Sequence, residues 1–169
     1  ALNRWKIDWK NGLFSQIGVR GVYMENDGGQ LSSVNNEGAP RWAMDHETRR
    51  ADIWIKTGKV WKDQPWKSTG LQINSTYHIH NANYGLRTYD ADQKSLYANW
   101  IYQSIISNSA HVIKGGLSYQ HDVFNELVDS VNYDREEIVP GAFGEYTFLP
   151  NNKTTLVLGL RADHHNSYG

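Results

Sequence analysis

The feature that most constrains this chain is a two-residue alternation of apolar and polar side chains, repeated almost from end to end. Trp5, Ile7 and Trp9, for example, are separated by charged residues. Successive side chains of a β-strand point to opposite faces, so a period of two predicts strands. No segment combines a helix cap with an apolar stripe of helical period. We therefore expect an all-β protein of about eight long strands. The predicted strands lie at residues 4–10, 13–24, 49–56, 71–80, 96–103, 113–120, 138–148 and 156–163.

The connections between these runs alternate between short and long. Asn11-Gly12 is the strongest hairpin signal, because both residue types accept positive φ. Alternating lengths predict an antiparallel up-and-down meander with its short turns at one end, which is the layout of a transmembrane β-barrel. Pro140 predicts a bulge or a late start in its strand. The predicted short connections are 11–12, 62–67, 108–110 and 150–153, and the predicted long loops are 25–47, 81–93 and 124–135.

Composition narrows the classes of protein further. The 169 residues suit one domain, and the formal net charge of -1 leaves no cationic surplus for binding nucleic acid. Cysteine is absent, which excludes disulfide frameworks and thiolate metal sites. No apolar run approaches the roughly 20 residues of a membrane helix. Charges throughout residues 1–10 indicate that no signal peptide opens the chain.

Strand length and aromatic placement favour a membrane barrel. A barrel strand crosses the hydrocarbon layer in about 9–11 residues, whereas globular strands peak near 5–6 residues. The predicted strands are of the longer kind. Trp9 and Phe14 flank the first short turn, and Trp61 and Trp66 flank the second. Aromatic rings at headgroup level form the girdles of such barrels.

The C-terminal part of the chain resembles TonB-dependent outer-membrane receptors. Val139-Pro-Gly-Ala-Phe-Gly-Glu-Tyr-Thr-Phe148 is followed by a short turn and by Leu156-Val-Leu-Gly-Leu-Arg-Ala-Asp-His-His-Asn-Ser-Tyr-Gly169. The family pattern at this place is Gly-x-Arg-x-Asp-x-His/Asn-x-x-aromatic-Gly. Gly85-Leu-Arg-Thr-Tyr-Asp90, followed by Ser95-Leu-Tyr-Ala-Asn99, is similar to the receptors of Bacteroidetes-type bacteria. The residues that fit the C-terminal pattern are Gly159, Arg161, Asp163, His165, Tyr168 and Gly169.

The resemblance implies a barrel of about 22 strands whose lumen is closed by a plug domain. Residues 1–169 would be a partial barrel, with no plug domain, no signal peptide and no C-terminal strand. The implied location is the bacterial outer membrane, and the implied partners are outer-membrane lipid, the plug and the TonB energy-coupling protein. The implied function is energy-coupled uptake of a scarce small-molecule or glycan nutrient, such as a metal chelate, cobalamin or an oligosaccharide.

Candidate substrate contacts come from one polar face and one loop. His78 and His80 are two residues apart, on the side that a barrel turns inward, and can donate to a ligand or to the metal of a chelate. Tyr84, Arg87 and Tyr89 belong to the predicted 81–93 loop above them. No catalytic motif is present, and no third metal ligand lies near the two histidines in sequence. We therefore expect neither an enzyme nor a bound cofactor or metal.

Two other interpretations remain open. The first is a soluble β-barrel that binds an apolar ligand, as a lipocalin does, with its apolar residues turned inward. The second is a complete eight-stranded outer-membrane barrel. If the chain is instead a segment of a large barrel, its sheet should be open, with two unpaired edges and an uncovered apolar face. The soluble interpretation requires one shared core of Ile17, Val19, Ile53, Ile73, Leu117 and Leu158.

Overall fold

The structure is a computed structural model that describes residues 1–30 and 42–168. It confirms the all-β prediction. The only helical element in these ranges is a single 3-10 turn, η1 (Lys10–Gly12). The strands are β1 (Leu2–Asp8), β2 (Leu13–Gly29), β3 (Ala43–Trp61), β4 (Gln64–Tyr84), β5 (Arg87–Ile106), β6 (Asn108–Val128), β7 (Val131–Asn132), β8 (Arg135–Asn151) and β9 (Thr154–Asp163). Within these ranges, no helix is long and apolar enough to cross a membrane.

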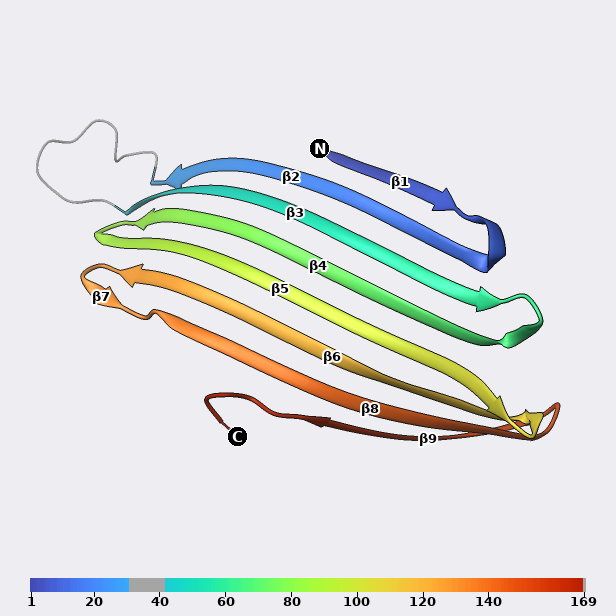
Figure 1. The fold of residues 1–169 in the computed structure, drawn as a ribbon. Coiled ribbons are helices and arrows are strands. Elements are labelled where there is room, and N and C mark those ends of the chain that lie inside the picture. Colours follow the sequence, from blue (N-terminus) through green and yellow to red (C-terminus); the bar gives the residue numbers. More distant parts are fainter. Residues whose placement is uncertain (31–41, 169) are drawn as a thin grey trace, which may run out of the picture.

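The strands form one open antiparallel sheet. Each long strand pairs with the next in the order β1-β2-β3-β4-β5-β6-β8-β9, and the two-residue β7 pairs with β6. Figure 1 shows the long strands side by side in one curved layer, with β1 and β9 at its two edges. The predicted up-and-down meander is therefore confirmed. We call the end that carries η1 the turn end and the end that carries Gly85 the distal end.

The first hairpin has the predicted turn chemistry. Asn11 and Gly12 have φ values of 73° and 75°. The Trp9 N–H donates to the Leu13 carbonyl at 2.9 Å and closes the turn. A Cβ atom on Gly12 would lie 2.1 Å from the Val60 carbonyl oxygen of the adjoining strand. The position therefore requires glycine for its backbone angle and for its space.

The predicted long loops are wrong, because most of their residues extend the strands. The 81–93 segment contains the end of β4, a two-residue turn at Gly85-Leu86, and the start of β5. Residues 25–29, 43–47 and 124–128 also belong to strands, while 31–41 lie outside the described residues. Both faces are polar in these extensions, so the hydropathy pattern disappears. The backbone ladder does not depend on that pattern and continues.

The predicted limits of β8 also need correction. Pro140 pairs with Tyr119 in unbroken register, so its strand has no bulge there and starts earlier, at Arg135. The Pro140 carbonyl accepts the His164 N–H at 3.0 Å. The N–H and C=O of a strand residue point to the same side, so the N–H that proline lacks would also face β9. The regular β8–β9 ladder ends at Gly141, so that missing donor breaks no pair.

Beyond Asp163 the chain runs along β8 without forming a strand. The side chain of Asn166 takes the place of a neighbouring peptide group. Its Oδ1 accepts the Ile138 N–H at 2.9 Å, and its Nδ2 donates to the Glu136 carbonyl at 2.8 Å. His165 and Tyr168, two residues of the family pattern, have ring centroids 4.7 Å apart. Gly169 lies outside the described residues.

The register separates the side chains onto two faces. Arg20, Asp52, Thr76, Ser95 and Asp122 form one row across five strands, and we call their side the polar face. Every second residue points the other way, onto the apolar face. One row of the apolar face consists of Trp5, Ile17, Ile55, Ile73, Ala98 and Tyr119.

The sheet has no conventional core among its described residues. Ala82 is the only buried hydrophobic residue, whereas Asp52, Thr76, Ser118 and Asp122 are buried on the polar face. Crowding on that side is expected if it is the inner side of the curve. On the apolar face, Leu117 is 56% exposed and Leu158 is 59% exposed. This confirms the predicted open sheet with an uncovered apolar face, and it contradicts the shared core that a soluble barrel requires.

The apolar face changes character along the strands. Towards the turn end it carries an apolar belt that includes Ile17, Val19, Ile53, Leu96 and Leu117. Towards the distal end it carries an acidic zone, in which carboxylates and amides replace the aliphatic residues. The acidic zone consists of Glu25, Asp27, Asp45, Glu47, Asn81, Asn83, Asp90, Asp92 and Asn125.

Candidate functional site

His78 and His80 lie on the polar face of β4, near the distal end, where they line a depression of about 300 Å³. Ala91 of β5 pairs with both His80 and Glu126, so its small side chain leaves space between them. Tyr89 lines the same depression. We call this feature the distal depression and define it by His78, His80, Tyr89, Gln93, Phe124 and Glu126.

Three imidazoles gather on one side of the distal depression. The ring centroid of His80 lies 5.6 Å from that of His46 and 6.3 Å from that of His78. His80 Nδ1 is hydrogen-bonded to Thr48 Oγ1 at 2.9 Å. Burial, together with the neighbouring His46 and His78, lowers the pKa of His80 from its ordinary value. His80 is therefore a neutral imidazole at neutral pH, with Nδ1 committed to Thr48.

His46 adds an unsatisfied nitrogen to this cluster. Its Nε2 accepts a hydrogen bond from the Asn26 amide at 2.9 Å. Its Nδ1 is buried, and it has no hydrogen-bond partner in the described part of the chain. Because Nε2 accepts, Nδ1 carries the ring hydrogen and is a buried donor without a partner, an exception to the usual pairing of buried polar atoms.

Tyr89 and an ion-pair network form the opposite side of the depression. The Tyr89 hydroxyl donates to Glu126 Oε1 at 3.0 Å, and Tyr89 lies 5.6 Å from His80 between ring centroids. Burial, followed by the hydrogen bond to Glu126, raises the pKa of Tyr89. Arg135 forms ion pairs with Glu126 and Glu137, and its guanidinium carbon lies 3.9 Å from the Phe124 ring centroid. This side is held in place before any ligand arrives.

The other two predicted contacts lie outside the depression. Tyr84 and Arg87 pair with each other beside the β4–β5 turn, on the polar face. Arg87 Nη1 lies 3.3 Å from a carboxylate oxygen of Asp129, and the other oxygen of Asp129 accepts the Thr88 N–H at 3.0 Å. Arg87 thus links two distal turns. Of the five candidates, the structure brings together His78, His80 and Tyr89.

Sequence reasoning missed several residues around the depression. They are His46, Thr48, Phe124, Glu126 and Arg135, and each was assigned to a predicted loop or to its boundary. The sequence did contain a usable signal. If the two-residue alternation of β3 and β6 is continued through those segments, His46, Thr48, Phe124 and Glu126 fall on the polar face. The charged composition of the segments obscured that signal.

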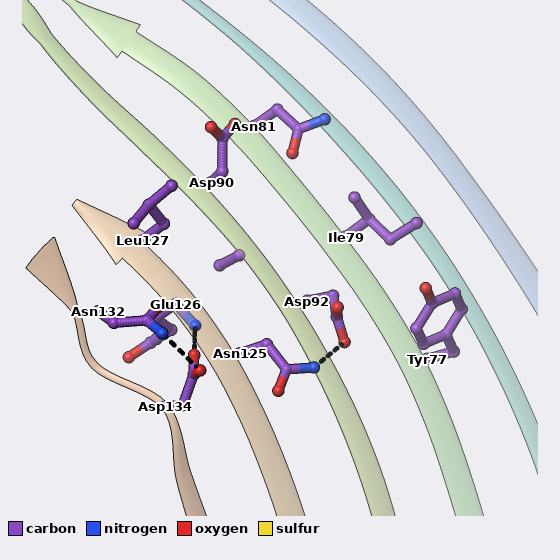
Figure 2. A pocket seen from close by; sticks show the side chains of 11 residues that line it. Tyr77, Ile79, Asn81, Asp90, Asp92, Asn125, Glu126, Leu127, Asn132 and Asp134 are labelled. Carbon is purple, nitrogen blue, oxygen red and sulfur yellow. Dashed lines mark hydrogen bonds between the residues drawn. The ribbon is translucent and has the colours of Figure 1, made fainter. Parts of the chain in front are cut away.

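A second depression, of about 390 Å³, lies at the distal end and opens within the acidic zone. Figure 2 shows its side chains across β4, β5 and β6, with Asn125 donating to Asp92 at 3.0 Å. Asp134 accepts the Asn132 amide at 2.9 Å and the Glu126 N–H at 2.9 Å. These carboxylates are therefore partly satisfied by the sheet itself. Across residues 1–30 and 42–168, no group of three or more acidic or histidine side chains is arranged to hold a metal ion.

The distal depression is suited to binding a polar solute. It offers two imidazoles, a phenol and an amide for hydrogen bonding, and aromatic faces for stacking. Its carboxylate is already paired with Arg135. Comparisons with protein-family models, with curated proteins and with solved structures give no match.

Proposed function

We propose that this chain is a barrel segment of a TonB-dependent receptor in the bacterial outer membrane, which imports a scarce nutrient without catalysing a reaction on it. The observation that carries the proposal is the apolar belt. It covers one face of a sheet whose other face is polar and whose edge strands, β1 and β9, each pair with one strand only in the described part of the chain. A face of this kind requires a nonpolar medium, because wet apolar surface costs about 25 cal/mol per Å².

The height of the belt fits a membrane. On β2 it extends from Leu13 to Tyr23, about 34 Å along the strand at 3.4 Å per residue. At a tilt of about 45° this length covers about 24 Å, and the lipid-facing band of outer-membrane barrels is about 25 Å tall. Tyr23 and Tyr77 lie at the distal border of the belt, and Trp9 lies near the turn end. Tyrosine and tryptophan are favoured at such interfaces.

In this proposal the polar face lines the lumen and the distal end lies outside the cell. The distal strand extensions then raise the distal depression above the lipid, where it can meet a nutrient. The substrate is of the class that the resemblance implies, a metal chelate, cobalamin or an oligosaccharide. Energy for transport comes from the TonB protein, through a plug domain.

The open edges favour a segment of a larger barrel over the two alternatives. In the described ranges, β1 and β9 do not pair with each other, as they would in a complete eight-stranded barrel. A soluble ligand-binding barrel would enclose its apolar residues, whereas here Ile53 is 48% exposed and Leu96 is 40% exposed.

Sedimentation of the isolated chain tests the membrane assignment. With detergent or lipid vesicles we expect a folded, β-rich species, and without them we expect aggregates. A compact monomer in detergent-free buffer would overturn the proposal.

Uptake by the intact receptor tests the function. We expect His80→Ala to reduce nutrient uptake by about tenfold, which corresponds to the loss of about 1.4 kcal/mol of binding. His111→Ala is the matched control, because His111 lies near the turn end, beside Tyr146. Equal uptake by the two variants would remove the distal depression from the proposal.

A further inference from the structure

The distal border of the apolar belt contains a gap between its side chains. Gly21 on β2 pairs with Ala51 on β3, and a Cβ atom added to Gly21 would meet nothing within 4 Å. A glycine beside an alanine leaves the backbone of both strands uncovered on the apolar face. The gap is a depression of about 550 Å³. We call it the border depression and define it by Gly21, Tyr23, Arg49, Ala51, Tyr77 and Ile79.

Two cationic side chains lie at the border depression, each beside a tyrosine ring. The guanidinium carbon of Arg49 is 5.9 Å from the centroid of the Tyr23 ring. Lys94 Nζ is 5.8 Å from the centroid of the Tyr77 ring. Lys94 pairs with Tyr77, which pairs with Ala51, so these residues form one row across three strands. The face of an aromatic ring attracts a cation, so the tyrosines hold both charges at this level of the sheet.

Both cations can still bind an anion. Arg49 uses its Nε in an ion pair with Glu47, and its side chain is 63% exposed. Lys94 forms no ion pair with any residue that the structure describes. In the distal part of the described strands, Arg49 and Lys94 are the only arginine and lysine on the apolar face. The positive charge of this face is therefore concentrated at one place.

The surroundings fix the level at which an anion can lie. Glu47 and Asp92, of the acidic zone, are the next residues of this face on the distal side of the two cations. Their carboxylates repel an anion that lies farther out. On the turn side the belt is apolar and cannot solvate a charge. An anionic group is stabilised between these regions, at the level of the tyrosines.

The border depression matches a molecule that has an anionic head and an apolar tail. Its floor is the backbone of Gly21 and Ala51, and it meets the belt at the next pair toward the turn end, Val19 with Ile53. A soluble anion would leave this apolar floor in water, which is unfavourable. A phospholipid fills both parts, because its phosphate meets the cations while an acyl chain covers the floor and continues along the belt.

The spacing of the cations suits one phosphate group. Arg49 and Lys94 are two strands apart and differ by two residues along the strands, so their backbones are about 12 Å apart. Two extended side chains can meet at a single phosphate over this distance. Arginine binds phosphate through paired N–H groups, and lysine binds it as a point charge.

We propose that the border depression is a binding site for an anionic phospholipid of the outer leaflet. The phosphate lies between Arg49 and Lys94. An acyl chain lies over Gly21 and Ala51. This inference rests on the proposed membrane location and goes beyond it, because an apolar belt alone does not distinguish one lipid from another.

Photolabelling of the full-length protein tests the inference. Vesicles of equal parts phosphatidylcholine and phosphatidylglycerol contain a trace of one of these lipids with a diazirine on its acyl chain, and mass spectrometry maps the labelled residues. We expect the phosphatidylglycerol probe to label the border depression about fivefold more than the phosphatidylcholine probe. At Leu117, in the belt on β6, we expect the two probes to label equally.

Charge removal assigns the preference to the two cations. Arg49→Gln combined with Lys94→Gln should lower labelling by phosphatidylglycerol to the level of phosphatidylcholine. Arg4→Gln combined with Lys56→Gln is the matched control, because it also removes one exposed arginine and one exposed lysine, but from the polar face. The control should keep the fivefold preference.

Two results would overturn the inference. One is equal labelling of the border depression by the two probes, and the other is a preference that persists without the charges of Arg49 and Lys94. In both cases labelling of Leu117 still supports the membrane assignment. If neither probe labels Leu117 or any other residue of the belt, the membrane assignment fails and the lipid site fails with it, so the two failures can be distinguished.

Discussion

The two halves of this sheet have the same backbone and different surroundings. Near the turn end one face carries the apolar belt and the other is polar, so the two-residue period is obvious in the sequence. Near the distal end the same strands continue, but the acidic zone replaces the belt and both faces are polar. Hydropathy alternation therefore reports that one face of a strand is apolar and the other polar. It does not report the strand itself, which the ladder of backbone hydrogen bonds forms in either half.

The largest expected difference between the halves comes from a charge placed on the apolar face. In the proposed membrane, Leu117→Lys puts a cation inside the belt and should cost about 2–4 kcal/mol. Asn125→Lys makes the same type of change on the same strand and face, but within the acidic zone, and should cost less than about 0.5 kcal/mol. Urea unfolding of the chain in phospholipid vesicles measures both free energies. Equal costs would show that the belt does not meet lipid.

Turn glycines give the next difference. Gly12→Ala should destabilise the chain by about 2–3 kcal/mol, because it adds a contact with the Val60 carbonyl to the strain of a positive φ. Gly85 has a φ of 66°, and a Cβ atom added to it would lie 3.1 Å from a Trp42 side-chain atom, which can shift. Gly85→Ala should cost about 1–2 kcal/mol. Urea unfolding in vesicles measures both free energies of unfolding, and a larger loss for Gly85→Ala than for Gly12→Ala would contradict this ranking.

The hydrogen bond between Tyr89 and Glu126 predicts a smaller effect within the distal half. Tyr89→Phe removes the hydroxyl and should cost about 0.5–1.5 kcal/mol of local stability. Tyr84→Phe is the control, because the Tyr84 hydroxyl has no hydrogen-bond partner among residues 1–30 and 42–168. Amide exchange of β5 and β6 measures the change. No difference between the variants would mean that the network around Glu126 does not order this region.

The smallest effect is a pH dependence confined to the distal half. The pKa of His80 is lowered in the folded state, so the unfolded state binds the proton more readily. The stability linked to His80 is therefore complete above its ordinary pKa of about 6.5 and declines as the pH falls below that value. Amide exchange at pH 7.5 and pH 5.5 should show faster opening of distal β4 at the lower pH. His80→Gln should remove this difference, and if the variant keeps it, another group is responsible.

The comparison explains which features could be predicted from sequence. The belt strands were found because Ile53, Ile73 and their neighbours alternate with polar residues. The turn at Asn11-Gly12 was found because its geometry depends on its own two residues. The distal extensions were missed because their residues show no alternation of apolar and polar side chains. Which residues pair there, such as Tyr84 with Arg87, follows from the register that the same strands already have in the belt.

The residues of the candidate site also separate into those that sequence could predict and those that it could not. His78 and His80 could be predicted, since their spacing places both on one face of a strand that shows alternation. Thr48, Glu126 and Arg135 could not, because only the pairing of β3, β4, β5, β6 and β8 brings them around the same depression. That information is a set of long-range contacts, and one strand read alone does not contain it.

The Asn166 side chain has a consequence for self-association. By occupying the backbone groups of Ile138 and Glu136, it seals the distal stretch of β8 against an incoming strand. Among the described residues the opposite margin has no such seal, because β2 continues for eight residues, Val22 to Gly29, past its last backbone contact with Ala1. An exposed margin of this length invites strand exchange. If isolated chains assemble laterally, they should therefore grow from the β2 margin, and a single proline at Tyr23, whose backbone N–H faces that margin as that of Gly21 does, should block that growth.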